Sequence, residues 1–353
     1  MVTPARRRRV TIADVASHAQ VSITAVSKVI NNAYGVSPAM KNKVKTAIEE
    51  LNYRPQAVAR GMRGRTFTIG LVLPHIRNPF FADILDGLTA YLESTDYQAF
   101  MIAGGAARKV EHRAVDALMD RQVDGIIMVA PLASKARLEE VAKEKPLVVL
   151  ARHERSPHYD SVLDDDEAGA ELVVKHLIEL GHRRIAHITH QDDSIARPGD
   201  LLHNIRSGSY ERVMREHGLA DEIAIATSFY SEQGGYDGAR RLLGRAPRPT
   251  AIFAGADSAA LGALAALHEA GLSVPGDVSV AGYDNTHLAA LPNIALTSVD
   301  QDGREMGRAA GKLLLERVEG RMTPVRFSVT PSLVVRGSTA APAAPAGPVP
   351  AVR

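Results

Sequence analysis

The stretch TIADVASHAQVSITAVSKVI, residues 11–30, decides the fold of the amino-terminal part of the chain. Thr11 is a good helix cap, and Asp14 in the first turn can return a hydrogen bond to that cap. Apolar residues then recur at the spacing of one helix face, at Ile12, Val15, Ala16 and Ala19. This pattern predicts a short helix that ends near Gln20.

Two more helices follow at short intervals. Ser22 is a second cap, and its helix carries an apolar stripe at Val26, Val29 and Ile30. Ser37 and Pro38 begin a third helix, with a stripe at Val44, Ala47, Ile48 and Leu51. Two short helices joined by a tight turn and covered by a third indicate a helix-turn-helix module, whose second helix enters the DNA major groove. Any small three-helix domain is the alternative.

The charge of the chain is divided unevenly. Residues 1–65 hold 12 Lys and Arg against 3 Asp and Glu, whereas the other 288 residues hold 30 against 37. A small basic module therefore precedes a mildly acidic body, which indicates a polyanionic partner for the first part alone. A solvated basic tail would give the same charge counts, so the helix pattern has to distinguish a DNA-binding module from such a tail.

Length and composition exclude several classes of protein. With 353 residues and 45% hydrophobic composition, two or three domains with large cores are expected. No cysteine is present, so disulfides, zinc ribbons, iron–sulfur clusters and thiol nucleophiles are excluded. No apolar run approaches the ~18 residues of a membrane helix, and the arginines at 6–9 are not followed by the apolar stretch of a secretory signal. We therefore expect a cytoplasmic protein with no membrane partner.

The second helix of the module supplies the residues expected to meet DNA. Ile23, Thr24 and Ala25 lie at its amino-terminal end, where base edges are reached. Other side chains suit phosphate or base hydrogen bonds, namely Thr11, Ser22, Ser27, Lys28 and Asn31. Beyond the third helix, Pro55 can open a helix of about two turns that Gly64 closes. Such a short helix is marginal alone, so it either folds on docking or is a simple tether.

Residues 66–337 alternate apolar runs with helical patterns. Eight strands are predicted, at 68–73, 98–103, 125–130, 147–151, 184–189, 223–226, 251–254 and 278–281. Amphipathic stretches between them, such as 81–92, 168–180, 236–243 and 259–270, predict helices. This alternation is typical of parallel sheets with helices on both faces. The length exceeds one comfortable core, so we predict two lobes, with a ligand at the carboxyl ends of the strands.

The amino-terminal motifs resemble those of the lactose-repressor/galactose-repressor (LacI/GalR) family. They are VTIADVA (10–16), VSKVIN (26–31) and LNYRP (51–55). The resemblance implies that residues 57–62 become a hinge helix in the minor groove, with Met62 where the family has a wedging leucine. It completes the expected DNA contacts with Tyr53, Gln56, Ala59 and Met62. Gln20 departs from the family, which often has glycine in the turn.

The body resembles the periplasmic-binding-protein-like effector domain of the same family. The motifs are NPFF (78–81), HLIELGHRRIA (176–186) and VPGDVSVAGYD (274–284). The resemblance implies two lobes that share segments, chain crossings near Val162, Leu291 and Thr323, and a homodimer. The expected division is a DNA-binding head at 1–54, a hinge at 55–65, an effector domain at 66–337, and a disordered Ala/Pro-rich tail at 338–353.

The resemblance also implies an effector site. The matching positions are Asn78, Phe80, Arg152, Arg206, Tyr230, Asp257, Asp284 and Gln301. An arginine fork and a carboxylate suit the recognition of hydroxyl pairs or of a carboxylate. Ala151 and Ala256 stand where the family often has polar side chains, and the segment before Arg206 is longer than usual. The resemblance implies a sugar or a related metabolite as the ligand, but these departures count against a simple sugar and leave a larger, anionic or unusual compound open. Ordinary surface or interlobe ion pairs are the alternative for these residues.

The combined pattern predicts a dimeric, effector-controlled transcriptional repressor that binds a near-palindromic operator. A solute-binding protein for a transporter is the alternative, because it would share the two-lobed fold. An enzyme is not expected, since the chain has no G-x-S-x-G, P-loop or G-x-G-x-x-G motif. Neither Asp164-Asp165-Asp166 nor the pair His187 and His190 suits a metal site, because their side chains would point in different directions. We expect no cofactor and no metal.

Overall fold

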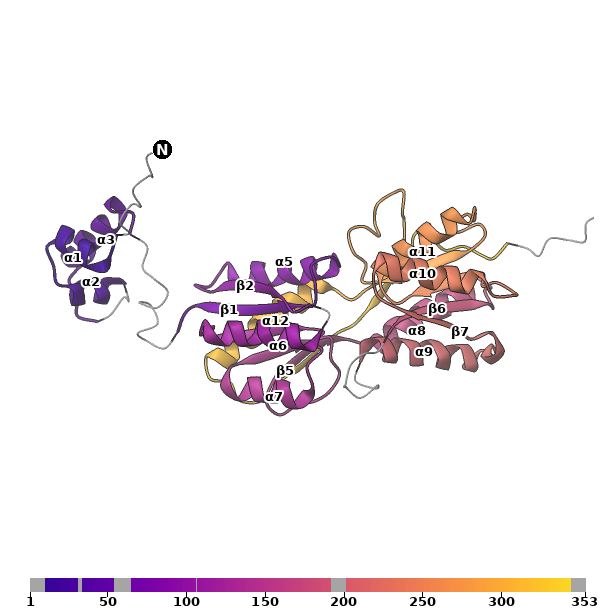
Figure 1. The fold of residues 1–353 in the computed structure, drawn as a ribbon, viewed down its shortest axis with the longest axis horizontal. Helices are drawn as coiled ribbons and strands as arrows, with labels where there is room; N and C mark the ends of the chain where they lie inside the picture. The colour runs from indigo at the N-terminus through magenta and orange to yellow at the C-terminus, as the bar shows by residue number, and fades with distance from the viewer. Residues whose placement is uncertain (1–9, 31–33, 54–64, 106, 192–200, 344–353) are drawn as a thin grey trace, which may run out of the picture. The chain divides into compact units, whose positions relative to one another are not determined.

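The computed structural model describes residues 10–30, 34–53, 65–105, 107–191 and 201–343. The chain divides into two compact units, residues 1–68 and 69–353. The second unit consists of two lobes, each built on its own six-stranded sheet (Figure 1). No helix among the described residues is long and apolar enough to cross a membrane.

The described residues of the first unit form three helices: α1 (Ile12–Ala19), α2 (Ile23–Ile30) and α3 (Pro38–Glu50). The predicted cap is present, since Thr11 Oγ1 accepts a hydrogen bond from Asp14 N and the Asp14 carboxylate accepts one from Thr11 N at 2.7 Å. Gln20 ends α1 in the left-handed region, with φ 53°. The stripes expected from the sequence meet in one core that contains Val15, Val26, Val44, Ala47 and Tyr53.

The first lobe contains a sheet in the order β11-β5-β4-β3-β1-β2. Its strands are β1 (Thr68–Leu73), β2 (Gln98–Ala103), β3 (Gly125–Val129), β4 (Leu147–Leu150), β5 (Asp160–Asp164) and β11 (Arg326–Val329). Its helices are α5 (Phe80–Leu92), α6 (Arg108–Asp120), α7 (Lys135–Glu144) and α12 (Gly303–Val318). The α5 and α12 helices pack on each other, while buried side chains of α6 and α7 join a separate core with β3 and β4.

The second lobe contains a sheet in the order β12-β10-β9-β8-β6-β7. Its strands are β6 (Ile185–His190), β7 (Ala224–Ser228), β8 (Ala251–Ala254), β9 (Ser279–Tyr283), β10 (Thr297–Asp300) and β12 (Ser332–Val334). Its helices are α8 (Asp166–Glu179), α9 (Leu202–Glu216), α10 (Glu232–Leu243) and α11 (Asp257–Glu269), with a 3-10 turn at Ala220–Glu222. One core lies under α8 and α9 and the other under α10 and α11, so helices cover both faces.

From β11 to β1 in the first sheet and from β7 to β10 in the second, neighbouring strands are parallel, whereas β12 pairs antiparallel with β10. All eight predicted strands are present, with ends shifted by up to a few residues. Four strands were not predicted: β5, β10, β11 and β12. They have three to five residues, and each begins with a polar residue and holds at most two consecutive apolar ones, so none has the long apolar run that marks the predicted strands.

Over the described residues the chain passes between the lobes three times. It does so between β5 and α8, between β10 and α12, and between β11 and β12. The first passage lies beside the predicted Val162. The predictions near Leu291 and Thr323 are too early, because β10 of the second lobe follows Leu291 and β11 of the first lobe follows Thr323. Both crossings were placed too early because the strands β10 and β11, which precede the passages, were not predicted.

The tail prediction is wrong for residues 338–343. Ser338 is buried, donates to Val280 O at 2.6 Å and accepts from Thr297 N at 2.8 Å. The carbonyl of Ala340 lies 2.8 Å from His182 Nε2. The effector domain therefore extends past 337, while residues 344–353 lie outside the described residues.

The contact between α5 and α12 depends on small residues. A Cβ on Gly307 would lie 1.9 Å from the Ile84 carbonyl oxygen, so no side chain fits there. We predict that Gly307→Ala lowers the free energy of unfolding by about 1–3 kcal/mol. Gly208→Ala in α9 is the matched control, because a Cβ there meets no atom within 4 Å. That change is expected to be neutral or stabilising by up to about 1 kcal/mol. Denaturant unfolding measures both, and equal effects would contradict the close packing.

Candidate effector site and DNA-binding surface

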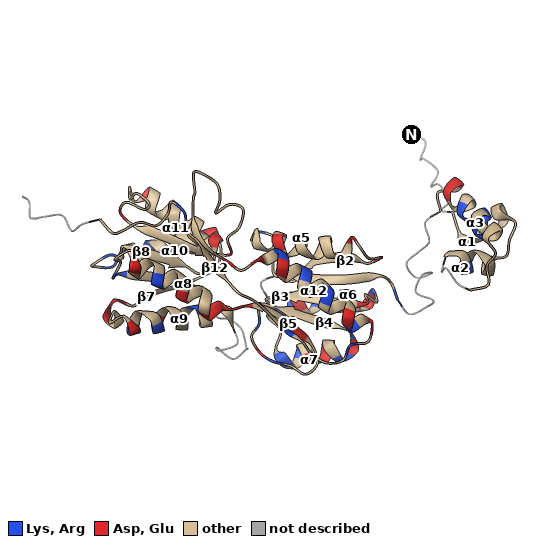
Figure 2. Cartoon of the chain, turned by 180° about the vertical axis from the view of Figure 1, so that it is seen from behind, with Lys and Arg blue, Asp and Glu red and all other residues tan. Residues whose placement is uncertain are grey.

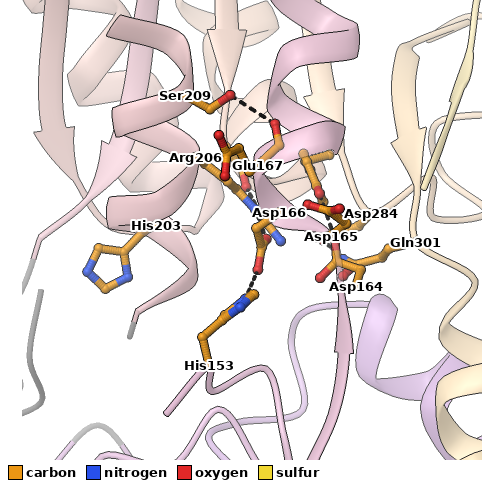
Figure 3. Close-up of polar contacts among 12 residues, drawn as sticks. His153, Asp164, Asp165, Asp166, Glu167, His203, Arg206, Ser209, Asp284 and Gln301 are labelled. Carbon is orange, nitrogen blue, oxygen red and sulfur yellow. Dashed lines mark hydrogen bonds and ion pairs between the residues drawn. The ribbon is translucent and has the colours of Figure 1, made fainter. Parts of the chain in front are cut away.

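Acidic side chains gather where strands end and helices begin near the passages between the lobes. Asp164 ends β5, Asp166 begins α8, and Asp284 follows β9. Figure 2 shows this acidic colouring at the crossing segments. Figure 3 labels six residues of a group around Arg206: His153, Asp164, Asp166, Arg206, Asp284 and Gln301. We call these six the interlobe cluster, together with Asn78, which donates to Asp284, and Tyr283, which donates to Asp164.

Arg206, on α9, is the central cation of the interlobe cluster. Its Nε donates to Asp166 Oδ1 at 2.6 Å, and its Nη1 donates to the Gly255 carbonyl at 2.7 Å. The guanidinium carbon lies 3.5 Å from the centre of the Tyr283 ring. Both members of the ion pair are buried, at 3% exposure for Arg206 and 1% for Asp166. Two of the guanidinium nitrogens are therefore committed to the protein itself.

Asp166 divides its two oxygens between the lobes. Oδ1 accepts from Arg206 of the second lobe, and Oδ2 lies 2.6 Å from Nε2 of His153, which follows β4 of the first lobe. Burial opposes ionisation of this carboxyl, but Arg206 and His153 together hold its pKa below the ordinary value. Asp166 is therefore a buried anion with a partner on each side.

Asp164 has the opposite electrostatic character. Its Oδ2 accepts the Tyr283 hydroxyl at 2.6 Å. Burial, and then the neighbouring negative charge of Asp166, raise the pKa of Asp164 to about 7. Asp164 therefore gains or loses its proton near neutral pH.

Asp284 joins the two lobes through amide side chains. Its Oδ1 accepts from Gln301 Nε2 at 2.7 Å, and its Oδ2 accepts from Asn78 Nδ2 of the first lobe at 3.3 Å. Asn78 also caps the start of α5, where its Oδ1 accepts from Phe80 N. Burial and the charge of Asp257 raise the pKa of Asp284 well above its ordinary value. These contacts bring together three of the residues expected in the effector site.

Asp257 holds the second lobe together. Its Oδ2 accepts from Thr286 N at 2.7 Å and from Thr286 Oγ1 at 3.0 Å, and its Oδ1 accepts from Ser298 Oγ at 2.6 Å. Burial raises its pKa to about 6. Both oxygens serve the loop after β9 and strand β10, so a structural role fits Asp257 better than the expected ligand contact.

Arg152 also has a structural environment. Its Nη1 donates to the carbonyls of Pro131 and Ala133, and its Nη2 donates to Glu154. This side chain anchors the loop after β4 within the first lobe. Of the other expected ligand residues, Phe80 is buried at the start of α5 and Tyr230 lies with its ring centre 5.2 Å from that of His190.

Sequence reasoning missed four members of the interlobe cluster: His153, Asp164, Asp166 and Tyr283. The sequence excludes the run 164–166 as a metal site and predicts a helix only from 168. In the structure Asp164 ends a strand, Asp165 caps α8 by accepting from Ala168 N, and Asp166 is already helical. The run of three adjacent carboxylates was the feature of the sequence that could have indicated Asp164 and Asp166 as site residues. No group of three or more His, Asp or Glu among the described residues could hold a metal ion.

The described part of the head exposes the start of α2. Ile23 is 51% exposed, and Ser22, Thr24 and Lys28 are exposed beside it. Ala25 and Ser27 are half-buried, and Thr11 is exposed at the start of α1. Tyr53 is 8% exposed and packs in the head core. Asn31, Gln56, Ala59 and Met62 lie outside the described residues.

Two family models match the chain. The model described as "Bacterial regulatory proteins, lacI family" matches residues 11–56, and the periplasmic binding protein-like domain matches residues 174–339. The HTH-type transcriptional repressor PurR of Aliivibrio salmonicida is 34% identical over 333 residues, which cover 93% of this chain and 98% of the relative. The ribose operon repressor of Haemophilus influenzae is 34% identical over 334 residues, with the same coverage.

The chain belongs to the lacI family of bacterial regulatory proteins. Solved structures of regulators in this family also match the chain. The lac repressor dimer bound to operator and the anti-inducer ONPF matches with a TM-score of 0.80 and 27% identity, over 95% of this chain and all of that one. A complex of the transcriptional regulator CelR with cellobiose matches with a TM-score of 0.68 and 31% identity, over 94% and 100%.

Family membership confirms the general function predicted from the sequence. The chain is a DNA-binding transcriptional regulator with a periplasmic-binding-protein-like effector domain, and it is not an enzyme. A solute-binding protein is disfavoured, because the lacI-family model matches the head.

The raised pKa of Asp164 gives a test of the electrostatics. Because the folded protein disfavours ionised Asp164, the contribution of this group to the free energy of unfolding should fall as the pH rises from about 4 towards 7. Asp164→Asn removes that charge and keeps an oxygen for the Tyr283 hydroxyl. We predict that this variant melts at least about 2 °C above the parent at pH 8, and that the advantage disappears near pH 4. Thermal unfolding across this range measures it. A variant with a lower Tm than the parent at pH 8 would contradict the assignment.

Proposed function

We propose that the chain is a dimeric transcriptional repressor whose affinity for a near-palindromic operator changes when a small hydroxylated ligand binds between its two lobes. The observation that carries this proposal is the interlobe cluster, which places hydrogen-bonding side chains of both lobes around one arginine. A ligand that touched both lobes there would change how strongly they associate.

The exposed start of α2 is the surface proposed to read DNA. Ile23, Thr24 and Ala25 can contact base edges, while Ser22, Lys28 and Thr11 suit phosphates. Residues 55–65 are the proposed hinge, with Met62 as an apolar wedge in the minor groove. A structure of the lac repressor dimer on its operator supports this arrangement by analogy.

The chemistry of the interlobe cluster favours a neutral, hydroxyl-rich ligand. Asp284, Asn78 and Gln301 offer acceptors and donors from both lobes. The buried, ionised Asp166 disfavours an anionic ligand, and Arg206 already pairs with it. Structures of CelR with cellobiose and of a regulator from Enterococcus faecium with bound ribose support a sugar or a related metabolite.

The edge strand β2 is proposed to meet a second copy of the chain. Phe100 and Met101 in this strand are 58% and 47% exposed, and Val110 at the start of the neighbouring α6 is 42% exposed. An edge strand with exposed apolar side chains is costly to leave uncovered. Dimerisation would also present two heads to a two-fold operator.

Selection of genomic fragments by the purified chain tests the proposal. We expect a small set of near-palindromic sites, bound with an affinity that falls steeply as the salt concentration rises. Sequencing the bound fragments shows the sites, and mobility shifts at two salt concentrations show the dependence. Binding that is indifferent to both sequence and salt would contradict a sequence-specific repressor.

The proposed wedge has its own test. Met62→Ala is expected to lower affinity for the selected operator at least about tenfold and to change non-specific affinity far less, because the wedge needs a deformed site. Met322→Ala is the matched control, since Met322 is 80% exposed in the effector domain. Mobility shifts on operator and on scrambled DNA measure both. Equal losses on the two DNAs would make Met62 a tether residue.

The proposed effector contact of Asn78 can be separated from DNA binding. Asn78→Ala removes the hydrogen bond to Asp284 from the first lobe and leaves the head unchanged. We expect operator affinity within about twofold of the parent and a weakened response to the compound that releases the parent. Operator titrations with metabolite fractions measure the response. A full response in the variant would remove Asn78 from the site.

A further inference from the structure

We propose that His153 is a positioning residue for the effector response: its hydrogen bond to Asp166 ties the first lobe to the Asp166–Arg206 ion pair of the second lobe. The inference rests on the proposed function, because it takes Arg206 as part of the effector site. It goes beyond that function in naming how the site is tied to the opposite lobe.

The loop that carries His153 is fixed to the first lobe at several points. Arg152 donates to the carbonyls of Pro131 and Ala133, and Arg326 of β11 donates to the His153 carbonyl at 2.7 Å. The Arg326 guanidinium also lies 3.4 Å from His153 Nδ1. The His153 backbone therefore moves with the first lobe.

Asp166 belongs to the other lobe. It is the first residue of α8, which packs against β8, β10 and β12 of the second sheet and against α9. The contact of 2.6 Å between His153 Nε2 and Asp166 Oδ2 therefore joins the lobes. His153 is 14% exposed and Asp166 is 1% exposed, so little water competes for this contact.

The same carboxylate fixes Arg206. Asp166 Oδ1 accepts a hydrogen bond from Arg206 Nε at 2.6 Å. The Arg206 guanidinium also donates to Gly255 O and packs over the Tyr283 ring. Without His153, Asp166 Oδ2 loses its partner and the carboxylate gains freedom to rotate. Arg206 would keep its position in the second lobe but lose its link to the first.

A backbone contact next to the His153–Asp166–Arg206 chain of contacts, which we call the relay, also joins the loop after β4 to the second lobe. Arg152 forms an antiparallel bridge with Leu201, which immediately precedes α9 and is buried. The loop after β4 thus touches the starts of both α8 and α9, the two helices that carry Asp166 and Arg206. A ligand that displaces the guanidinium would act on the first lobe through this loop.

The absence of cysteine makes the lobe separation measurable. Lys143→Cys and Gln233→Cys introduce exposed labelling sites in the last turn of α7 and the first turn of α10, one in each lobe and away from the proposed dimer surface at β2. Spin labels on the full-length chain, without DNA or ligand, then report the interlobe distance distribution. We expect a narrow distribution for the parent pair.

Substitution of His153 tests the relay in this labelled background. His153→Ala should shift the distribution to longer distances and broaden it at least about twofold, because one tie between the lobes is lost. His153→Phe keeps the ring volume without the hydrogen bond and should give the same shift. His153→Gln can still donate to Asp166 and should restore the narrow distribution. His158→Ala, in the same loop, is the control and should match the parent.

An unchanged distribution in both His153→Ala and His153→Phe overturns the proposal, as does a shift in His158→Ala equal to theirs. If His153→Ala fails to fold, the comparison of His153→Phe with His153→Gln decides. The distance measurement uses neither operator nor effector, so a negative result there would not contradict the proposed function. A failure to find an operator would equally leave the distance result intact.

Discussion

The ion pair between Arg206 and Asp166 is the interaction on which the site depends. Both groups are buried, and a charge left unpaired in such a place costs several kcal/mol. Asp166 therefore needs Arg206, and Arg206 in turn fixes its position against Gly255 and Tyr283. The pair holds the starts of α8 and α9 together at the edge of the second sheet that faces the first lobe. The hydrogen bonds from His153 and Asn78 cross to this edge.

The three passages of the chain explain why so much polarity gathers in one place. Each passage follows the carboxyl end of a strand, and parallel strands bring their carboxyl ends to one edge of a sheet. Asp164 and Gln301 lie on two of these passages, and each contacts the second lobe, through Tyr283 and Asp284 respectively. A change in lobe geometry must therefore disturb this group, which suits a protein that converts ligand binding into a change at the DNA.

The sequence predicted the head and most strands, because their apolar periodicity reports local structure directly. It missed β5, where the aspartates at both ends of DSVLD mask three apolar or small central residues, all buried. The same masking hid Asp164 and Asp166, since a run of carboxylates reads as a solvated turn unless its burial is known. Arg206 and Asp284 were found through resemblance, but that Arg206 is committed to Asp166 depends on long-range packing that no local pattern encodes.

A double-mutant cycle on the free energy of unfolding of the full-length chain, with Arg206→Met and Asp166→Leu, tests the central claim most directly. The account predicts that each single change costs about 3–5 kcal/mol, because each leaves a buried charge without its partner. The double variant should cost at least about 2 kcal/mol less than the sum of the single changes, because neither charge then remains. Effects that add within about 0.5 kcal/mol would show that the two side chains act independently, and would contradict the account.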